Sequence, residues 1–166
     1  MKEDSVLKDK VILVVDDEPD VLDIIEEELQ ECMVHKAKDY ETAIEYMLSY
    51  SYDAVVLDIM GVNGFELLRQ AVSLKFPTVM LTAHAVTEDA LKKSIKLGAV
   101  SFLPKEKLPE LKEFVKGAVM KKGNRMWKTV FDKMGNYFNK RFGSDWKERD
   151  KFFKEFEESL KKIEPE

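Results

Sequence analysis

Short apolar runs that each end in a polar residue are the feature that most constrains how this chain can fold. Such runs end at Asp16, Asp58, Thr82 and Lys105, and helical patterns separate them. Near-continuous apolar runs of this length are typical of strands buried in a parallel sheet. Because a helical pattern follows each run, right-handed crossovers are expected to join the strands. The sequence therefore predicts an α/β fold with a doubly wound, five-stranded parallel sheet.

The expected elements alternate along the first 122 residues. We expect strands at 11–15, 33–38, 53–57, 77–82 and 100–103, and helices at 20–31, 41–50, 65–75, 87–97 and 109–121. Pro19 suits the first turn of its helix, and Gly98 suits the end of the helix at 87–97. A glycine-containing loop at 61–64 follows the third strand.

Composition limits the classes of protein to be considered. The hydrophobic fraction of 45% is enough for a well-formed core, and the net charge of −5 argues against a nucleic-acid-binding surface. Cys32 is the only cysteine, so no internal disulfide is expected. The first residues lack the apolar region of a signal peptide, and no apolar run is long enough to span a bilayer. We expect a cytoplasmic protein.

The composition changes after Lys122, and we predict two parts: a domain at 1–122 and an aromatic-rich helical extension at 123–166. Both tryptophans and over half of the aromatic residues lie in the extension. Helical spacing relates two sets of large apolar residues: Trp127, Val130, Phe131, Met134, Phe138 and Phe142, then Trp146, Phe152, Phe153, Phe156, Leu160 and Ile163. Gly143 lies between the sets, and Asp145 with Glu148 resembles a capping box. The pattern predicts two amphipathic C-terminal helices.

The apolar faces of these helices need a partner, because an exposed patch of that size is unusual. The extension can pack on its own domain, pair with a second copy in a homodimer, or lie on a membrane surface. Interspersed acidic residues disfavour the membrane, and no DNA-binding helix pattern is present. We therefore expect the extension to mediate protein contacts, and we expect a homodimer before the other arrangements.

Polar side chains at the ends of the predicted strands indicate where the chemistry lies. In an open α/β sheet, ligands bind outside the carboxyl ends of the strands. The carboxylates of Asp16, Asp17 and Asp58 are oxygen ligands of the kind that Mg²⁺ prefers. A cation there would relieve their repulsion and screen an incoming phosphate, so that Asp58 can attack phosphorus. Lys105 offers a positive charge to a phosphoryl oxygen, and Thr82 offers a hydroxyl donor.

This combination resembles the receiver domain of two-component response regulators, over roughly Lys10 to Lys122. The resemblance implies a flavodoxin-like receiver fold and a place in a phosphorelay. It implies that Asp58 accepts a phosphoryl group from a sensor histidine kinase or a phosphotransfer protein. It also implies that the domain is no enzyme beyond its own phosphotransfer and dephosphorylation, and that it signals through protein contacts.

The same resemblance assigns the remaining roles. Asp16 and Asp17 would hold Mg²⁺ together with Asp58, and the backbone carbonyl of Met60 would complete the protein's share. Thr82 and Lys105 would contact the phosphoryl group. Thr82 and Phe102 would form the switch that remodels the face around the helices expected at 87–97 and 109–121.

Two departures from the family pattern keep other interpretations open. The loop after Asp58 is shorter than usual and has no proline, and Pro104 precedes Lys105 where Lys-Pro is usual. A pseudo-receiver that is never phosphorylated is one alternative. A metal-dependent phosphohydrolase with Asp58 as nucleophile is another, although Met60 stands where such enzymes commonly carry a second Asp. His84, two residues after Thr82, is expected to be an exposed loop residue.

Overall fold

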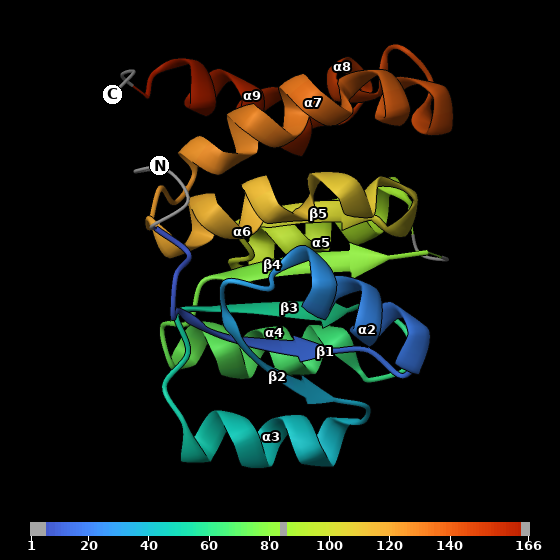
Figure 1. The fold of residues 1–166 in the computed structure, drawn as a ribbon. Coiled ribbons are helices and arrows are strands. Elements are labelled where there is room, and N and C mark those ends of the chain that lie inside the picture. Colours follow the sequence, from blue (N-terminus) through green and yellow to red (C-terminus); the bar gives the residue numbers. More distant parts are fainter. Residues whose placement is uncertain (1–5, 84–85, 164–166) are drawn as a thin grey trace.

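The computed structural model describes residues 6–83 and 86–163, and Figure 1 shows their arrangement. The sheet has five strands: β1 (Val11–Val15), β2 (Met33–Ala37), β3 (Ala54–Asp58), β4 (Thr78–Thr82) and β5 (Ser101–Pro104). All pair in parallel, in the order β2-β1-β3-β4-β5. Every residue of β3, β4 and β5 is buried, which explains why these segments read as apolar runs.

Helices cover both faces of the sheet. They are α2 (Pro19–Glu28), α3 (Tyr40–Ser49), α4 (Gly64–Ser73), α5 (Glu88–Leu97) and α6 (Leu111–Val119), with a 3₁₀ helix, η1 (Lys105–Glu110), before α6. The contacts place α2 beside α6 on one face, whereas α3, α4 and α5 adjoin one another on the other. This is the doubly wound, flavodoxin-like fold, and the predicted fold class is confirmed.

The observed elements differ from the expected ones mainly at their ends. Asp58 is the last residue of β3, whereas the strand was expected to end one residue earlier. The ladder continues because the N–H of Ile59 donates to the carbonyl of Leu81 at 3.0 Å. The helix expected at 109–121 begins at Leu111, after η1. Pro109 lies inside η1 and has no N–H to donate to an α-helical hydrogen bond. The chain there forms the tighter 3₁₀ turn instead of an α-helix.

The C-terminal extension forms three helices instead of the expected two: α7 (Arg125–Phe142), α8 (Trp146–Arg149) and α9 (Lys151–Lys161). The break lies at Asp150, whose extended backbone and carboxylate cap α9 through a 2.8 Å bond from the N–H of Phe152. The capping box predicted at Asp145 is wrong. The Asp145 carboxylate instead accepts a 2.9 Å bond from Nε of Arg149 and makes no cap bond.

The extension packs on its own chain. Figure 1 shows α7, α8 and α9 beyond β5, at the edge of the sheet. Their buried side chains join those of the sheet in one continuous core, and the rings of Phe102 and Phe138 lie 6.1 Å apart across the contact. The apolar faces that favoured a homodimer are thus covered within the chain, and an edge strand is covered with them. The domain boundary at Lys122 stays a prediction.

Among the described residues, no helix has the length and apolarity needed to cross a membrane.

Candidate functional site

Four strand ends bring the predicted side chains to one edge of the sheet. Asp16 follows β1, Asp58 ends β3, Thr82 ends β4, and Lys105 follows β5. The register pairs Asp58 with Leu81, so Thr82 is the next residue along the neighbouring strand. The parallel topology therefore places these groups together, as the sequence predicted.

Lys105 is the centre of the cluster. Its Nζ lies 2.8 Å from Oδ2 of Asp16, 2.8 Å from Oε1 of Glu18 and 3.5 Å from Oδ1 of Asp58. Only 11% of the Lys105 side chain is exposed, and Asp16 is fully buried. Glu18 was not expected to take part, although its position directly after Asp16 and Asp17 placed it at the same edge.

The acidic loop after β1, Asp16 to Glu18, is held by a hydrogen bond between its own backbone and a side chain. The N–H of Glu18 donates to Oδ1 of Asp16 at 2.9 Å, which fixes that carboxylate. Oδ2 of Asp16 is buried and forms an ion pair with Lys105. Among the described residues, no group donates a well-aligned hydrogen bond to this oxygen. Asp16, Asp17 and Glu18 each offer a carboxylate oxygen within 4.8 Å of the others. This donor set fits a hard divalent cation such as Mg²⁺.

The titration behaviour of the site follows from burial and crowding. Burial raises the pKa of Asp58 to about 7, the charge of Asp16 adds to this, and Lys105 opposes it. Burial likewise raises the pKa of Asp16, against the nearby ammonium. Burial disfavours the charged form of Lys105, but the adjacent carboxylates of Asp16, Glu18 and Asp58 outweigh that effect and raise its pKa. One ammonium does not fully compensate the buried carboxylates, so added positive charge would be favourable here.

A hollow of about 170 Å³ opens beside these groups, lined by Asp17, Glu18, Asp58, Met60, Gly61 and Lys105. Gly61 has a φ of +88°, and a Cβ on it would lie 2.6 Å from Oδ2 of Asp17. Glycine thus lets the loop after β3 approach the acidic loop closely. Met60 is 55% exposed, and it is its backbone carbonyl that the resemblance assigns to the site.

The short loop after Asp58 closes by tight backbone packing. The N–H of Gly64, the first residue of α4, donates to the carbonyl of Ile59 at 3.0 Å. A Cβ at Gly64 would lie only 2.1 Å from the carbonyl oxygen of Asp58. Asn63 adopts the left-handed conformation, with a φ of 57°. The shortened loop therefore sets α4 directly against the end of β3, and a glycine at 64 is a steric requirement.

Two of the remaining predicted residues are buried in the sheet, and the third is not described. Thr82 is fully buried at its strand end. Phe102, expected as a switch residue, is also fully buried, within β5, and contacts the extension through Phe138. His84 lies outside the described residues.

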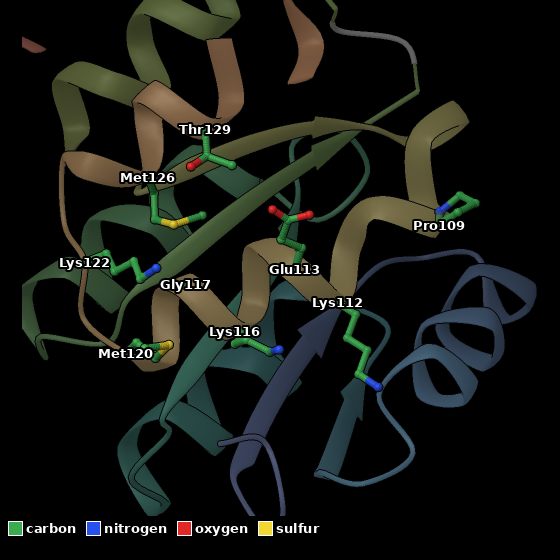
Figure 2. A pocket seen from close by; sticks show the side chains of 9 residues that line it. All are labelled: Pro109, Lys112, Glu113, Lys116, Gly117, Met120, Lys122, Met126 and Thr129. Carbon is green, nitrogen blue, oxygen red and sulfur yellow. The ribbon is translucent and has the colours of Figure 1, made fainter. Parts of the chain in front are cut away.

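A second cavity, of about 530 Å³, lies between α6 and the start of α7 (Figure 2). Its lining is Pro109, Lys112, Glu113, Lys116, Gly117, Met120, Lys122, Met126 and Thr129. None of these residues lines the hollow beside Asp58. This larger cavity lies where α6 meets α7. The clustered carboxylates lie at the smaller hollow beside Asp58.

Comparison with known proteins places the fold in one family. Residues 12–116 match the family model described as the response regulator receiver domain. The two-component response regulator ARR18 of Arabidopsis thaliana is 35% identical over 57% of this chain, and the response regulator GtcR of Aneurinibacillus migulanus is 30% identical over 58%. The chain spans 16% and 41% of the length of these two relatives.

Solved receiver structures have the same fold. The receiver domain of the Francisella response regulator 1452 superposes with a TM-score of 0.62 at 24% identity, covering 69% of this chain and 99% of that one. The response regulator TrrA of Thermotoga maritima, solved in complex with Mg²⁺ and beryllium fluoride, gives a TM-score of 0.58 at 35% identity. It covers 66% of this chain and 98% of its own. In both comparisons, nearly all of the known structure is matched.

Proposed function

This chain belongs to the response regulator receiver family, and from that premise we propose that it accepts a phosphoryl group on Asp58 within a two-component phosphorelay. The observation that carries the proposal is the ammonium of Lys105, held 3.5 Å from Oδ1 of Asp58 beside the buried Asp16. A nucleophilic carboxylate, an acidic metal-binding loop and a phosphoryl-binding cation thereby share one hollow.

The reaction needs an ionised nucleophile and compensation of charge. A carboxylate oxygen of Asp58 attacks phosphorus, a P–O bond forms, and the bond to the donor's nitrogen or oxygen breaks. The leaving group keeps the electron pair and takes a proton from solvent. Lys105 binds a phosphoryl oxygen, and the Thr82 hydroxyl donates to another. Asp16, Asp17, Asp58 and the carbonyl of Met60 would hold Mg²⁺, which supplies positive charge that keeps Asp58 ionised and offsets the charge on phosphate.

The proposed partners follow from this chemistry. The donor is a sensor histidine kinase or a phosphotransfer protein, and the output passes through protein contacts. We propose no turnover of external substrates, because the residue two positions after Asp58 is Met60, which cannot protonate a leaving group. A Mg²⁺-dependent phosphohydrolase remains the alternative from a different class, and an unphosphorylated adaptor is the other.

Incubation with Mg²⁺ and acetyl phosphate separates the three functions. We expect intact mass spectrometry to find one phosphoryl group per chain, and none on Asp58→Asn. We expect no sustained hydrolysis of p-nitrophenyl phosphate. Catalytic turnover of that ester, lost in Asp58→Asn, would establish the phosphohydrolase instead. A wild type that is not phosphorylated, and whose melting temperature does not change with Mg²⁺, would establish the unphosphorylated adaptor.

A further inference from the structure

The cavity between α6 and α7 has the size of a small-molecule site. Its volume is about 530 Å³, and pockets that hold organic ligands commonly measure roughly 300–1,000 Å³. Figure 2 shows that its lining side chains come from α6, from the linker that follows it and from the start of α7. None of them lines the hollow beside Asp58, so a ligand bound here would leave the acidic cluster open.

The surroundings of this cavity are basic in an otherwise acidic protein. Residues 112–129 hold six basic residues and one acidic residue, a net charge of +5, whereas the whole chain has a net charge of −5. The acidic residue is Glu113, and its carboxylate is paired with the ammonium of Lys133 at 3.1 Å. Positive charge is thus concentrated around the cavity, where it favours an anionic ligand.

Three lysines line the cavity. Nζ of Lys112 lies 2.8 Å from Oε2 of Glu31. This contact lowers the pKa of Glu31, and the charge of Lys116 adds to the effect, so two ammonium groups act on one carboxylate. Within the part of the chain that the structure describes, Lys122 makes no ion pair. Lysine ammonium groups are compact point charges that suit phosphoryl oxygens.

The cavity also has an apolar wall. Met126 is 3% exposed, and its sulfur lies so close over Gly117 that an added Cβ there would collide with it. Met120, which is 47% exposed, lines the cavity just after the end of α6. Thioether sulfurs make favourable contacts with aromatic rings. The hydroxyl of Thr129 can donate or accept a hydrogen bond. A ligand that combines negative charge with an aromatic ring would use both kinds of wall.

We propose that this cavity binds a nucleotide, with its phosphates on Lys116 and Lys122 and its base against Met120 and Met126. The volume favours an organic phosphate over a simple ion, which would fill only part of the space. The site is separate from Asp58 and does not depend on the function proposed above. Because α6 and α7 both contribute to the lining, a bound nucleotide joins the two helices and stabilises the folded chain.

Isothermal titration calorimetry of the full chain with ADP tests the site. The buffer contains EDTA and no Mg²⁺, so that the carboxylates near Asp58 cannot recruit phosphate through a metal ion. Pyrophosphate and adenosine are the comparison ligands, since each carries one half of the proposed chemistry. We expect ADP to bind more tightly than either of them and to raise the melting temperature.

Three variants locate the binding. Lys122→Gln should weaken ADP binding by about ten-fold, because it removes a charge-assisted hydrogen bond to phosphate. Lys121→Gln is the matched control: it removes the same charge from an exposed neighbour that does not line the cavity, and it should leave the affinity unchanged. Met120→Gln should weaken binding of ADP and leave binding of pyrophosphate unchanged, because it removes only the contact to the base.

Three results would overturn the inference, and none of them bears on phosphorylation of Asp58. Absence of both a binding heat and a rise in melting temperature at millimolar ADP would show that the cavity holds no nucleotide. Equal ADP affinity in the wild type, Lys122→Gln and Lys121→Gln would place the binding elsewhere. Pyrophosphate that binds as tightly as ADP would mean that the lysines hold a simple anion and that the methionines contact no base.

Discussion

The Lys105 ammonium lies 2.8 Å from Oδ2 of Asp16, an ion pair that joins the ends of β5 and β1 across the two strands between them. Asp16 is fully buried and Lys105 nearly so. Removing one member of a buried ion pair leaves the other charge uncompensated, and that usually costs more than the pair itself contributes. The pair therefore makes the stability of the sheet edge depend on Lys105.

Lys105→Met should consequently lower the free energy of unfolding at neutral pH without Mg²⁺, by on the order of 3 kcal/mol. Lys105→Arg is the matched control: it keeps the charge and should cost much less. Urea unfolding followed by circular dichroism measures both. Equal stability of the Met variant and the wild type would contradict the assigned role of the pair.

The raised pKa of Asp58 predicts a pH dependence of stability. The folded-state pKa is about 7, against an ordinary value of 3.8, so between these values the folded chain holds a proton that the unfolded chain releases. The free energy of unfolding should therefore fall as the pH rises from about 4 to about 7 and then level off. Each pKa unit corresponds to about 1.4 kcal/mol.

Urea unfolding in Mg²⁺-free buffer across this pH range tests the slope. Asp58→Asn cannot titrate at this position and should lose the part of the slope due to Asp58, while the contribution of Asp16 remains. Parallel pH curves for the two proteins would show that the buried Asp58 does not titrate as expected.

Glycine 64 has a steric role that a substitution can isolate. A Cβ there would lie 2.1 Å from the carbonyl oxygen of Asp58, so Gly64→Ala must displace the start of α4 or the end of β3. We expect a loss of several kcal/mol of stability, or failure to fold. Gly135, inside α7, has no atom within 4 Å of an added Cβ, so Gly135→Ala should stabilise by about 0.5–1 kcal/mol. A comparison of the two melting temperatures checks both, and a harmless Gly64→Ala would show that the short loop has room to spare.

Magnesium should stabilise the folded chain, because it binds the converged carboxylates and the unfolded chain has no such site. At a concentration 100 times Kd, the gain is about 2.7 kcal/mol. Asp17 is exposed, so Asp17→Asn should fold normally and respond much less. Thermal melts with MgCl₂ and with EDTA measure the difference. Equal responses in wild type and Asp17→Asn would exclude Asp17 as a ligand.

The sequence was sufficient to predict the sheet and most of the site for one physical reason. Buried parallel strands are apolar along their whole length, so the first polar residue marks the strand end, as at Asp16, Asp58 and Lys105. The carboxyl ends of parallel strands then meet at one edge. No comparable pattern identifies Glu18, because an exposed glutamate in a loop is ordinary until its distance to Lys105 is known.

The extension shows the limit of the same reasoning. Amphipathic spacing predicts that a face is buried but does not say against what. The homodimer that we expected first and the observed docking on β5 both satisfy it. Its division into three helices was missed because the apolar spacing continues across Asp150, where the capping bond to Phe152 makes a new start. The steric requirement at Gly64 arises from backbone packing, which leaves no periodic signal.

The identity of the phosphorylated residue tests the central claim most directly. Borohydride reduces an aspartyl phosphate to homoserine, which marks the modified position for peptide mass spectrometry. After incubation with Mg²⁺ and acetyl phosphate, we predict that homoserine replaces Asp58 in the wild type and that no residue is converted in Asp58→Asn. Conversion of Asp16, Asp17 or another residue, with Asp58 unchanged, would contradict the account.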